Sequence, residues 1–549
     1  MLKKSLLKQL QKPGRYLGTE INTSHKKRKR HHISVCLAFP DLYEIGMSHQ
    51  GIQILYSIIN ALDTATCERV FAPARDLEEL LRKKKVPLSS LESNTALHKF
   101  DVIGFSLSYE LCYTNIFTIL DCSTIPFKSE DRPSWPLVIA GGPASVNPEI
   151  LADFIDLFVI GDGEEVIKQI IALCAQHKKK HKQKEKEKLL CALSTLEGVY
   201  IPRLFKKGPA HAIQKISLRS LDQAPYPTKP IVPYIQTVHD RACVEIMRGC
   251  PHQCKFCQAR HFYHPVRLRE ANTIKELAQK ILAATGHDEL SLLSLSSGDY
   301  PHIESLIKDL SQSCSNNRVA LSFPSIRVEK LITILPYYLS QTKKTGLTFA
   351  PEAGSERLRR FIGKNINIDY LKESTLEAYT RGYQHIKLYF MIGLPTETRE
   401  DLDGIVKLVY ELAKMRMQVA KKPAQINVNI GTFIPKPHTA FEREKMDSVV
   451  LIQEKQNYLK EKFKKRYIKY HFTPAAISVL EGAFARGDRR MGDVITRAWH
   501  KGARFDAWKE HFNADIWKRA FEEKGIDLEQ YATRQIEEGE ILPWGHITL

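Results

Sequence analysis

The stretch Arg248-Gly-Cys-Pro-His-Gln-Cys-Lys-Phe-Cys-Gln258 decides the fold of this chain. Its thiols, Cys250, Cys254 and Cys257, have the spacing C-x3-C-x2-C. Three thiols on one loop can converge on an iron–sulfur cluster of four irons and leave one iron open, whereas simple electron carriers fill every position with Cys. An open iron indicates that a substrate or cofactor binds there.

A structural zinc is the alternative, because Cys3His is a common zinc ligand set and His252 lies within the motif. Zinc sites, however, usually combine short Cys pairs from two separate places. The other cysteines stand apart from one another, at Cys36, Cys67, Cys112, Cys122, Cys174, Cys191, Cys243 and Cys314. The spacing therefore favours the cluster over zinc.

The motif, with Phe256 before its last Cys, resembles the signature of the radical S-adenosylmethionine (SAM) superfamily. The resemblance implies a [4Fe-4S] cluster whose open iron chelates the amino and carboxylate groups of SAM. It also implies reductive cleavage of SAM to a 5′-deoxyadenosyl radical, with electrons from a donor of the flavodoxin or ferredoxin type.

Bulk properties predict a multidomain globular protein. A chain of 549 residues with 43% hydrophobic and 26% charged residues should form two or three domains. It contains no apolar run of the ~18–20 residues that a membrane span needs and no secretory signal. Eleven cysteines, an odd number, fit a reducing cytoplasm better than a disulfide framework. We therefore expect a cytoplasmic location without membrane contact.

The net charge of +19 is concentrated in three stretches. Residues 1–32 carry ten Lys or Arg and one acid, while 178–188 and 453–470 each carry seven Lys or Arg and two Glu. The rest of the chain is thus nearly neutral. Solvated segments are the usual explanation of such runs, and contact with RNA or the ribosome is the alternative.

The N-terminal part has a basic arm at 1–32, either flexible or packed as a strap, and an α/β domain at 33–190. Short apolar strands alternate with helical stretches, which is typical of a doubly wound, Rossmann-like parallel sheet. The expected strands are 33–39, 68–72, 101–107, 137–140 and 157–160, and the expected helices are 51–62, 77–84, 111–121 and 165–175. The Lys-rich residues 178–188 are expected to be a surface insertion or a helix extension.

This domain resembles the cobalamin-binding domain of cobalamin-dependent radical SAM enzymes. The segments that match imply a low-ranked set of cobalamin contacts: Ser106, Ser108, Gly141, Gly142, Gly161 and Glu164. The D-x-H-x-x-G motif, whose His ligates cobalt, is absent; His49, in Glu44-Ile-Gly-Met-Ser-His-Gln-Gly, is the nearest equivalent. His49 either reaches the metal or is a satisfied histidine at a helix start, and the domain either binds cobalamin or has lost it.

A proline-rich linker at 191–241 precedes a second α/β domain at 242–447. Its expected strands are 243–247, 290–295, 319–323, 346–350, 385–391 and 426–433. The expected helices are 274–285, 303–313, 328–339, 370–381 and 400–417. Six βα repeats with right-handed crossovers form a partial (β/α)6 barrel, the architecture of the radical SAM superfamily. In parallel barrels chemistry sits at the carboxyl ends of the strands, where the cysteine loop lies.

The same resemblance assigns SAM contacts to residues after the other strands. Besides Phe256, these are Ser297, Gly298, Asp299, Ser322, Arg327, Glu352, Gly393 and Glu397. Ser297-Gly-Asp departs conservatively from the usual Gly-Gly-Glu, and the stretch 433–441 closes strand six as in methylthiotransferases and cobalamin relatives.

Residues 448–549 are expected to be mostly helical, with tryptophans as core or interface anchors. One charged group either touches substrate or forms a structural ion cluster: Glu481, Arg486, Asp488, Arg489 and Arg490. The whole chain resembles an uncharacterised bacterial family of radical SAM proteins with a cobalamin-binding-like domain, often linked to a DUF2344 domain. We expect no such domain in these residues.

Three functions follow as expectations. The first is a radical SAM enzyme that transfers methyl groups to an unknown substrate if cobalamin binds. The second is a radical SAM enzyme with a vestigial cobalamin domain, and the third is an RNA- or ribosome-associated iron–sulfur protein.

Overall fold

The computed structural model describes residues 4–29, 31–178, 183–205, 212–322 and 347–549. Its first domain is a six-stranded sheet in the order β2-β1-β3-β4-β5-β6. The strands are β1 (Ile33–Phe39), β2 (Ala65–Phe71), β3 (Val102–Ser106), β4 (Leu137–Gly141), β5 (Leu157–Val159) and β6 (Val199–Tyr200). The first five are parallel, as the sequence predicts, and β6 adds an antiparallel edge to β5.

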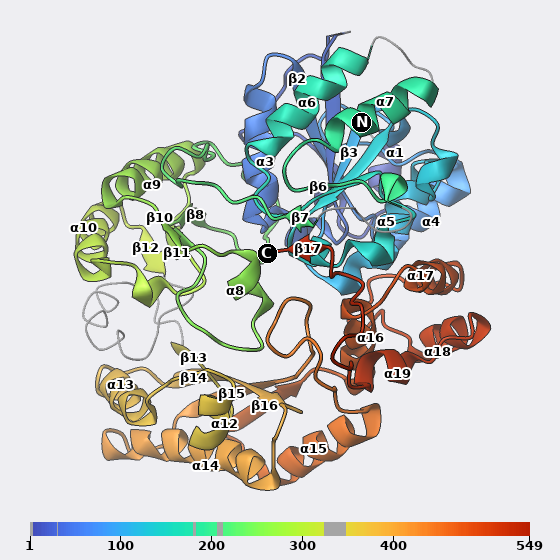
Figure 1. Ribbon diagram of the computed structural model, residues 1–549. Helices are drawn as coiled ribbons and strands as arrows, with labels where there is room; N and C mark the ends of the chain where they lie inside the picture. Colours follow the sequence, from blue (N-terminus) through green and yellow to red (C-terminus); the bar gives the residue numbers. More distant parts are fainter. Residues whose placement is uncertain (1–3, 30, 179–182, 206–211, 323–346) are drawn as a thin grey trace.

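Helices cover both faces of this sheet (Figure 1). They are α2 (Tyr43–Met47), α3 (Gln50–Ala61), α4 (Arg75–Lys84), α5 (Tyr113–Cys122), α6 (Val166–His177) and α7 (Gln183–Leu193). All seven residues of β1 are buried, which is why this strand reads as a continuous apolar run rather than an alternating one.

The basic arm packs as a strap on this domain over residues 4–29, beginning with α1 (Lys4–Leu7). The Glu20 carboxylate is buried, accepts a hydrogen bond from Tyr43 Oη at 2.9 Å, and pairs with Arg69 Nη2 at 3.1 Å. Arg69 in turn pairs with Glu92 at 2.6 Å. A charge from the arm is therefore built into the core of the first domain.

Two further parallel sheets form the central domain. One has the order β12-β11-β8 and contains β8 (Ala242–Glu245), β11 (Glu289–Leu293) and β12 (Ala320–Ser322). The other has the order β13-β14-β15-β16 and contains β13 (Leu347–Glu352), β14 (His385–Ile392), β15 (Gln425–Thr432) and β16 (Ile468–Phe472). The fold class predicted from the sequence is thus confirmed, with β16 as a parallel strand beyond the six expected.

Most helices of this domain lie on the outer side of the two sheets, whereas α8 lies towards the centre of the molecule (Figure 1). They are α8 (Gln258–Phe262), α9 (Ala271–Thr285), α10 (Ile303–Asn316), α12 (Glu356–Phe361), α13 (Ile368–Thr380), α14 (Arg399–Met415) and α15 (Val449–Lys462). Helix α14 starts at a capping box made by Thr398 and Asp401, which satisfies the first free amides of the helix. The expected helix 328–339 lies outside the described residues.

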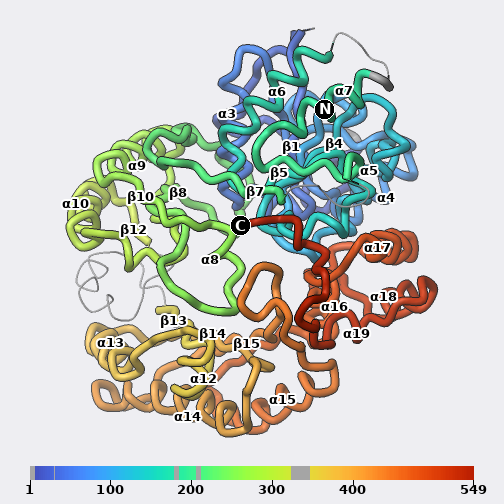
Figure 2. Tube along the Cα trace, in the orientation of Figure 1, coloured from blue at the N-terminus to red at the C-terminus, as the bar shows by residue number. Residues whose placement is uncertain are grey.

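The C-terminal region is helical, as expected, and joins the other two parts. Its helices are α16 (Ala475–Ala485), α17 (Arg490–His500), α18 (Ala514–Glu523) and α19 (Leu528–Thr533). One hydrophobic cluster runs from Phe117 of the first domain through Trp499 and Phe484 to Leu388 of the central domain. The chain then returns to the centre of the molecule, where β17 (Ile547–Thr548) pairs in parallel with β7 (Ile213–Gln214) (Figure 2).

A half-buried ion triad connects the same three parts. The Lys436 ammonium, after β15, donates to both oxygens of Glu110 in the first domain at 2.9 and 2.8 Å and to Glu481 of α16 at 2.7 Å. Burial alone would lower the pKa of Lys436, but the two carboxylates raise it above its usual value. Lys436 is therefore charged at neutral pH and neutralises two acids that would otherwise repel each other.

We expect Lys436→Met to destabilise the protein by about 3 kcal/mol, because removing one partner of a half-buried ion group leaves uncompensated charge. The midpoint of urea unfolding, followed by tryptophan fluorescence, measures the loss. Lys445→Met, at an exposed position, is the matched control and should leave the midpoint unchanged. An equal midpoint for both variants would show that the triad contributes nothing.

Candidate functional site

The cysteine loop follows β8 at the carboxyl end of the three-stranded sheet. Its base is closed by a short antiparallel pair, β9 (Met247–Arg248) with β10 (Arg267–Leu268). The three thiols are half-buried and form no disulfide, and α8 begins directly after Cys257. Burial raises the pKa of the Cys250 and Cys254 thiols, while Lys364 acts to lower it.

The loop is held in place by the second half of the central domain. Lys255 N donates to Ile362 O at 2.9 Å. Gly363, with a φ of +72°, lies so close that a Cβ atom there would stand 2.4 Å from Gln253 O. Phe256, predicted as a SAM contact, is partly buried and packs against the small cluster that includes Leu358 and Ile362. The loop therefore joins the two sheets.

His252 does not group with the thiols. Its Nε2 lies 2.6 Å from Oδ2 of Asp299, which also accepts a hydrogen bond from Ser296 Oγ at 2.5 Å. Within the described residues, no three His, Cys, Asp or Glu side chains are close enough to hold a single metal ion. The zinc alternative thus lacks its fourth ligand here, whereas a cuboidal cluster spans thiols that stand farther apart than the ligands of one ion.

The structure brings several predicted SAM residues to this edge. Ser297, Gly298 and Asp299 form a 3-10 turn directly after β11, and Asp299 is tied to the cysteine loop through His252. Glu352 ends β13 with a φ of +67°. Burial raises the pKa of Glu352 even though Lys364 Nζ lies 3.4 Å from its carboxylate.

Other predicted SAM residues have different surroundings. The Glu397 side chain is buried, accepts a hydrogen bond from Gly393 N at 2.9 Å and pairs with Lys455 at 2.7 Å. Its carboxylate therefore stabilises the turn between residues 393 and 397. The Ser322 hydroxyl is buried and without a hydrogen-bond partner among the described residues. Arg327 lies outside the described residues.

A cavity of about 450 Å³ lies between the first domain and the cysteine loop. On one side it is lined by the carboxyl ends of β1, β3, β4 and β5, and on the other by Met247, Gly249 and Tyr263 around the loop. Ligands bind at these strand ends in doubly wound folds. Its walls include predicted cobalamin contacts, namely Ser106, Gly141, Gly142, Gly161 and Glu164, whereas Ser108 is not among the lining residues.

His49 lines this cavity and is not the satisfied helix-start histidine considered above. It precedes α3 but makes no side-chain cap hydrogen bond. Its Nδ1 is buried and has no partner among the described residues, and burial lowers its pKa to about 4. A neutral imidazole with a free nitrogen is the protonation state that a metal ligand needs, so the donor set fits cobalt.

The presence of glycine at two positions of the cavity wall also has a purely structural explanation. Gly142 and Gly161 have φ values of +110° and +107°. A Cβ atom would stand 2.6 Å from Leu107 O at the first and 2.1 Å from Ile216 O at the second. Close backbone packing therefore requires glycine at both positions, whatever the cavity holds.

Arg248, two residues before Cys250, ties the cavity to the cysteine loop. Its guanidinium pairs with Asp162 at 2.8 Å, Glu164 at 2.8 Å and Glu245 at 2.9 Å. Asp162 also pairs with Arg267 of β10. Burial would raise the pKa of Asp162, but Arg248 and Arg267 hold it below its usual value. The sequence missed this role because Arg248 is a single Arg whose partners lie up to 86 residues away.

We expect Arg248→Met to destabilise the protein by about 3 kcal/mol or more, because two buried carboxylates and one half-buried carboxylate lose their shared cation. The stability of Arg248→Lys should lie between those of the unaltered protein and Arg248→Met, since an ammonium cannot reproduce the guanidinium fork. Urea unfolding and iron content per chain after anaerobic reconstitution are the measurements, with exposed Arg219→Met as control. Full iron content and stability in Arg248→Met would contradict this role.

The charged group of the C-terminal region is structural. Glu481 belongs to the Lys436 triad. Arg489 pairs with Glu149 at 2.5 Å, and Arg490 pairs with Asp488 at 2.7 Å. Arg486 is buried and donates to the carbonyls of Ala532 and Arg534, both at 2.8 Å.

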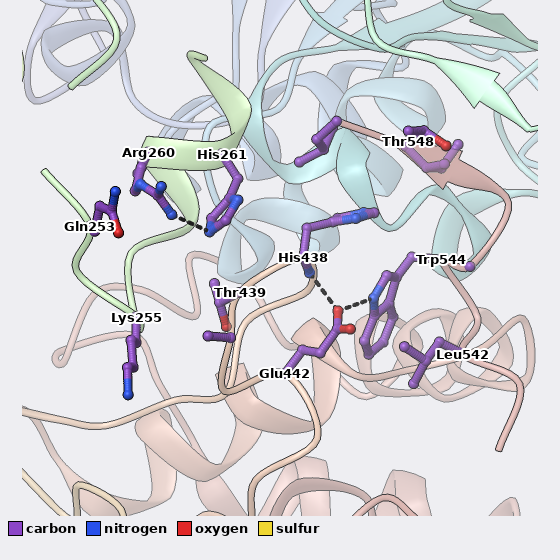
Figure 3. A pocket seen from close by; sticks show the side chains of 14 residues that line it. Gln253, Lys255, Arg260, His261, His438, Thr439, Glu442, Leu542, Trp544 and Thr548 are labelled. Atoms are coloured by element: carbon purple, nitrogen blue, oxygen red, sulfur yellow. Dashed lines mark hydrogen bonds between the residues drawn. The ribbon is translucent and has the colours of Figure 1, made fainter. Parts of the chain in front are cut away.

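A second, open pocket of about 640 Å³ adjoins the outer side of the cysteine loop. Three segments line it: the loop with α8, residues 438–442 after β15, and residues 542–549. Figure 3 shows Arg260 and His261 facing His438, Glu442 and Trp544 across this space. The sequence did not indicate this pocket, because its three walls are far apart in the chain.

No helix within the described residues is long and apolar enough to cross a membrane.

Comparisons with known proteins agree with this geometry. Residues 244–409 match the radical SAM superfamily, and residues 51–202 match the family described as radical SAM proteins, N-terminal. The central part of the chain is thus similar to radical SAM domains, and the part before it is similar to the N-terminal domain of such proteins.

Three curated proteins and one solved structure are similar to this chain. An uncharacterised protein of Methanocaldococcus jannaschii is 28% identical over 90% of this chain and 97% of its own length. An uncharacterised methyltransferase of Pyrococcus horikoshii is 23% identical over 57% of this chain and 64% of its own. The ribosomal protein uS12 methylthiotransferase RimO of a Sulfurihydrogenibium species is 24% identical over 32% and 43%. The radical SAM methyltransferase TsrM of Kitasatospora setae, solved with cobalamin and a [4Fe-4S] cluster, aligns with a TM-score of 0.49 at 13% identity over 75% of this chain and 77% of its own.

Proposed function

We propose that this protein is a radical SAM enzyme that transfers a methyl group with the help of cobalamin. The observation that carries the proposal is the shared wall between its two predicted cofactor sites. Cys250 follows Gly249, which lines the 450 Å³ cavity, and Arg248 bonds to Asp162 and Glu164 of the same cavity. The similarity to a curated methyltransferase supports the same direction.

Cys250, Cys254 and Cys257 would hold the [4Fe-4S] cluster, which when bound supplies the electron that cleaves SAM. Asp299 is linked to the loop through His252, and Glu352 is linked to Lys364 beside it. A carboxylate can accept hydrogen bonds from the SAM ammonium, so we assign these two acids to SAM. The segment 362–364 covers the loop and would limit access of water to it.

His49, Ser106 and the glycine-rich strand ends would hold cobalamin, which when bound carries the methyl group. The neutral His49 imidazole offers its free Nδ1 to the metal. The apolar wall that includes Leu37, Ile139 and Val159 would exclude water from the transfer. The electron donor of the flavodoxin or ferredoxin type belongs to the same proposal.

Cys254→Ala should abolish iron binding beyond background and the formation of 5′-deoxyadenosine, because the cluster then loses one of three ligands. The assay is anaerobic SAM cleavage after reconstitution with iron and sulfide. Cys243→Ala, on β8 but outside the motif, is the matched control and should keep both. SAM cleavage by the Cys254 variant would refute the proposal.

Ser106→Leu should fill the cavity and lower cobalamin retention at least tenfold, while SAM cleavage persists. His49→Ala should shift the absorbance bands of bound cobalamin, because a nitrogen ligand is lost. Desalting after reconstitution with hydroxocobalamin, followed by an absorbance spectrum, reports both. Ser315→Leu, at an exposed position of α10, is the control. If the unaltered protein retains no cobalamin, the enzyme is a radical SAM enzyme without the methyl-transfer step.

A further inference from the structure

The open pocket beside the cysteine loop presents a cation without a counter-ion. No carboxylate lies within salt-bridge distance of the Arg260 guanidinium among the described residues, and Arg260 Nη1 instead lies 3.4 Å from His261 Nε2 (Figure 3). Most Arg residues that line the interior of this molecule pair with acids, as Arg248 and Arg267 do. Most N–H donors of Arg260 are therefore available to a ligand in the pocket.

The contact between Arg260 and His261 fixes which ring nitrogen of His261 carries the proton. An Arg cannot accept a hydrogen bond, so Nε2 of His261 accepts and the imidazole proton sits on Nδ1. Burial lowers the pKa of His261, and the nearby charges of Arg260, His438 and His264 lower it further. A neutral imidazole next to a positive guanidinium is the state expected where the local potential is positive.

Glu442 is the only acidic side chain among the described residues that line the pocket, and it is already engaged. Glu442 Oε2 accepts hydrogen bonds from His438 N at 2.7 Å and from Trp544 Nε1 at 2.8 Å. These bonds fix the turn after β15 to the C-terminal segment (Figure 3). Lys255, also in the wall, directs its ammonium to the ring of Phe361, 5.0 Å from the centroid. Arg260 is thus the charged side chain of this wall for which the described residues supply neither an ion pair nor an aromatic ring.

The pocket adjoins the proposed reaction site through the cysteine loop itself. Gln253 and Lys255, on either side of Cys254, belong to its wall, and Arg260 lies three residues after Cys257. Its volume of about 640 Å³ is within the range of small-molecule sites. A group held here would be anchored next to the segment that carries the cluster ligands.

We propose that this pocket binds an anionic group of the substrate, a phosphate or a carboxylate, through the guanidinium of Arg260. An Arg fork matches the geometry of both anions. Naming the ligand as substrate rests on the proposed radical SAM function; binding of an anion does not, and it is tested without turnover.

The test uses the cluster-loaded protein with saturating SAM, so that the SAM site is filled. Isothermal titration with inorganic pyrophosphate and, separately, with citrate distinguishes a phosphate-selective from a carboxylate-selective pocket. At least one should bind, and Arg260→Gln should weaken that binding roughly tenfold or more, as expected for the loss of a charged hydrogen-bond donor. The anion affinity of Arg260→Lys should lie between those of the unaltered protein and Arg260→Gln. Arg466→Gln, at an exposed position outside the pocket, should leave the affinity unchanged.

A second variant keeps the proposal testable if Arg260→Gln does not fold. Glu442→Gln retains an acceptor for His438 N and Trp544 Nε1 but removes the negative charge, so affinity for the same anion should rise roughly threefold. Absence of binding in the unaltered protein would overturn the proposal, and so would equal affinity in the Arg260→Gln variant or displacement of the anion by SAM. None of these outcomes would affect the result of the Cys254→Ala assay, so the two proposals fail separately.

Discussion

The pairing of Arg248 with three carboxylates is the interaction on which the site depends. Buried acids need a cation or they must be neutralised, and here one guanidinium serves Asp162 and Glu164 of the first domain and Glu245 of β8. The first domain therefore cannot move away from the cysteine loop without exposing or unpairing charge. This constraint fixes the distance between the 450 Å³ cavity and the thiols, as the proposed transfer between two cofactors would require.

The C-terminal helices also hold the first and central domains together. Helix α17 packs on α5 of the first domain, with Trp499 Nε1 donating to Thr118 at 2.9 Å. Helix α16 packs against the central domain and contributes Glu481 to the Lys436 triad. Each part thus contacts both of the others, and a single hydrophobic cluster continues through all three. The result is a rigid frame around the loop rather than three domains on linkers, consistent with sites that need close positioning.

The sequence predicted those features whose signal is local. Buried parallel strands give apolar runs, so the sequence predicted the five parallel strands of the first sheet and most of the central strands, and the cysteine spacing placed the loop. Strand β16 was missed because its Ile468-Lys-Tyr-His-Phe sequence lies in a Lys-rich stretch and pairs on one edge only. The charge runs were also misleading. Lys186 and Lys455 belong to them, yet Lys186 is buried against Asp156 and Lys455 is half-buried between Glu397 and Asp447.

Long-range contacts set the limits of prediction within the site itself. Glu164 was assigned to cobalamin from its motif, but its carboxylate is engaged by Arg248, which no sequence pattern could indicate. The cysteine loop emerges as the wall shared by three spaces. Gly249 faces the cavity of the first domain, His252 reaches Asp299 at the predicted SAM edge, and Lys255 lies in the pocket of Arg260. Because these spaces meet at one short, tightly held loop, the methyl carrier, radical source and anchored substrate that we propose would all stand next to that loop.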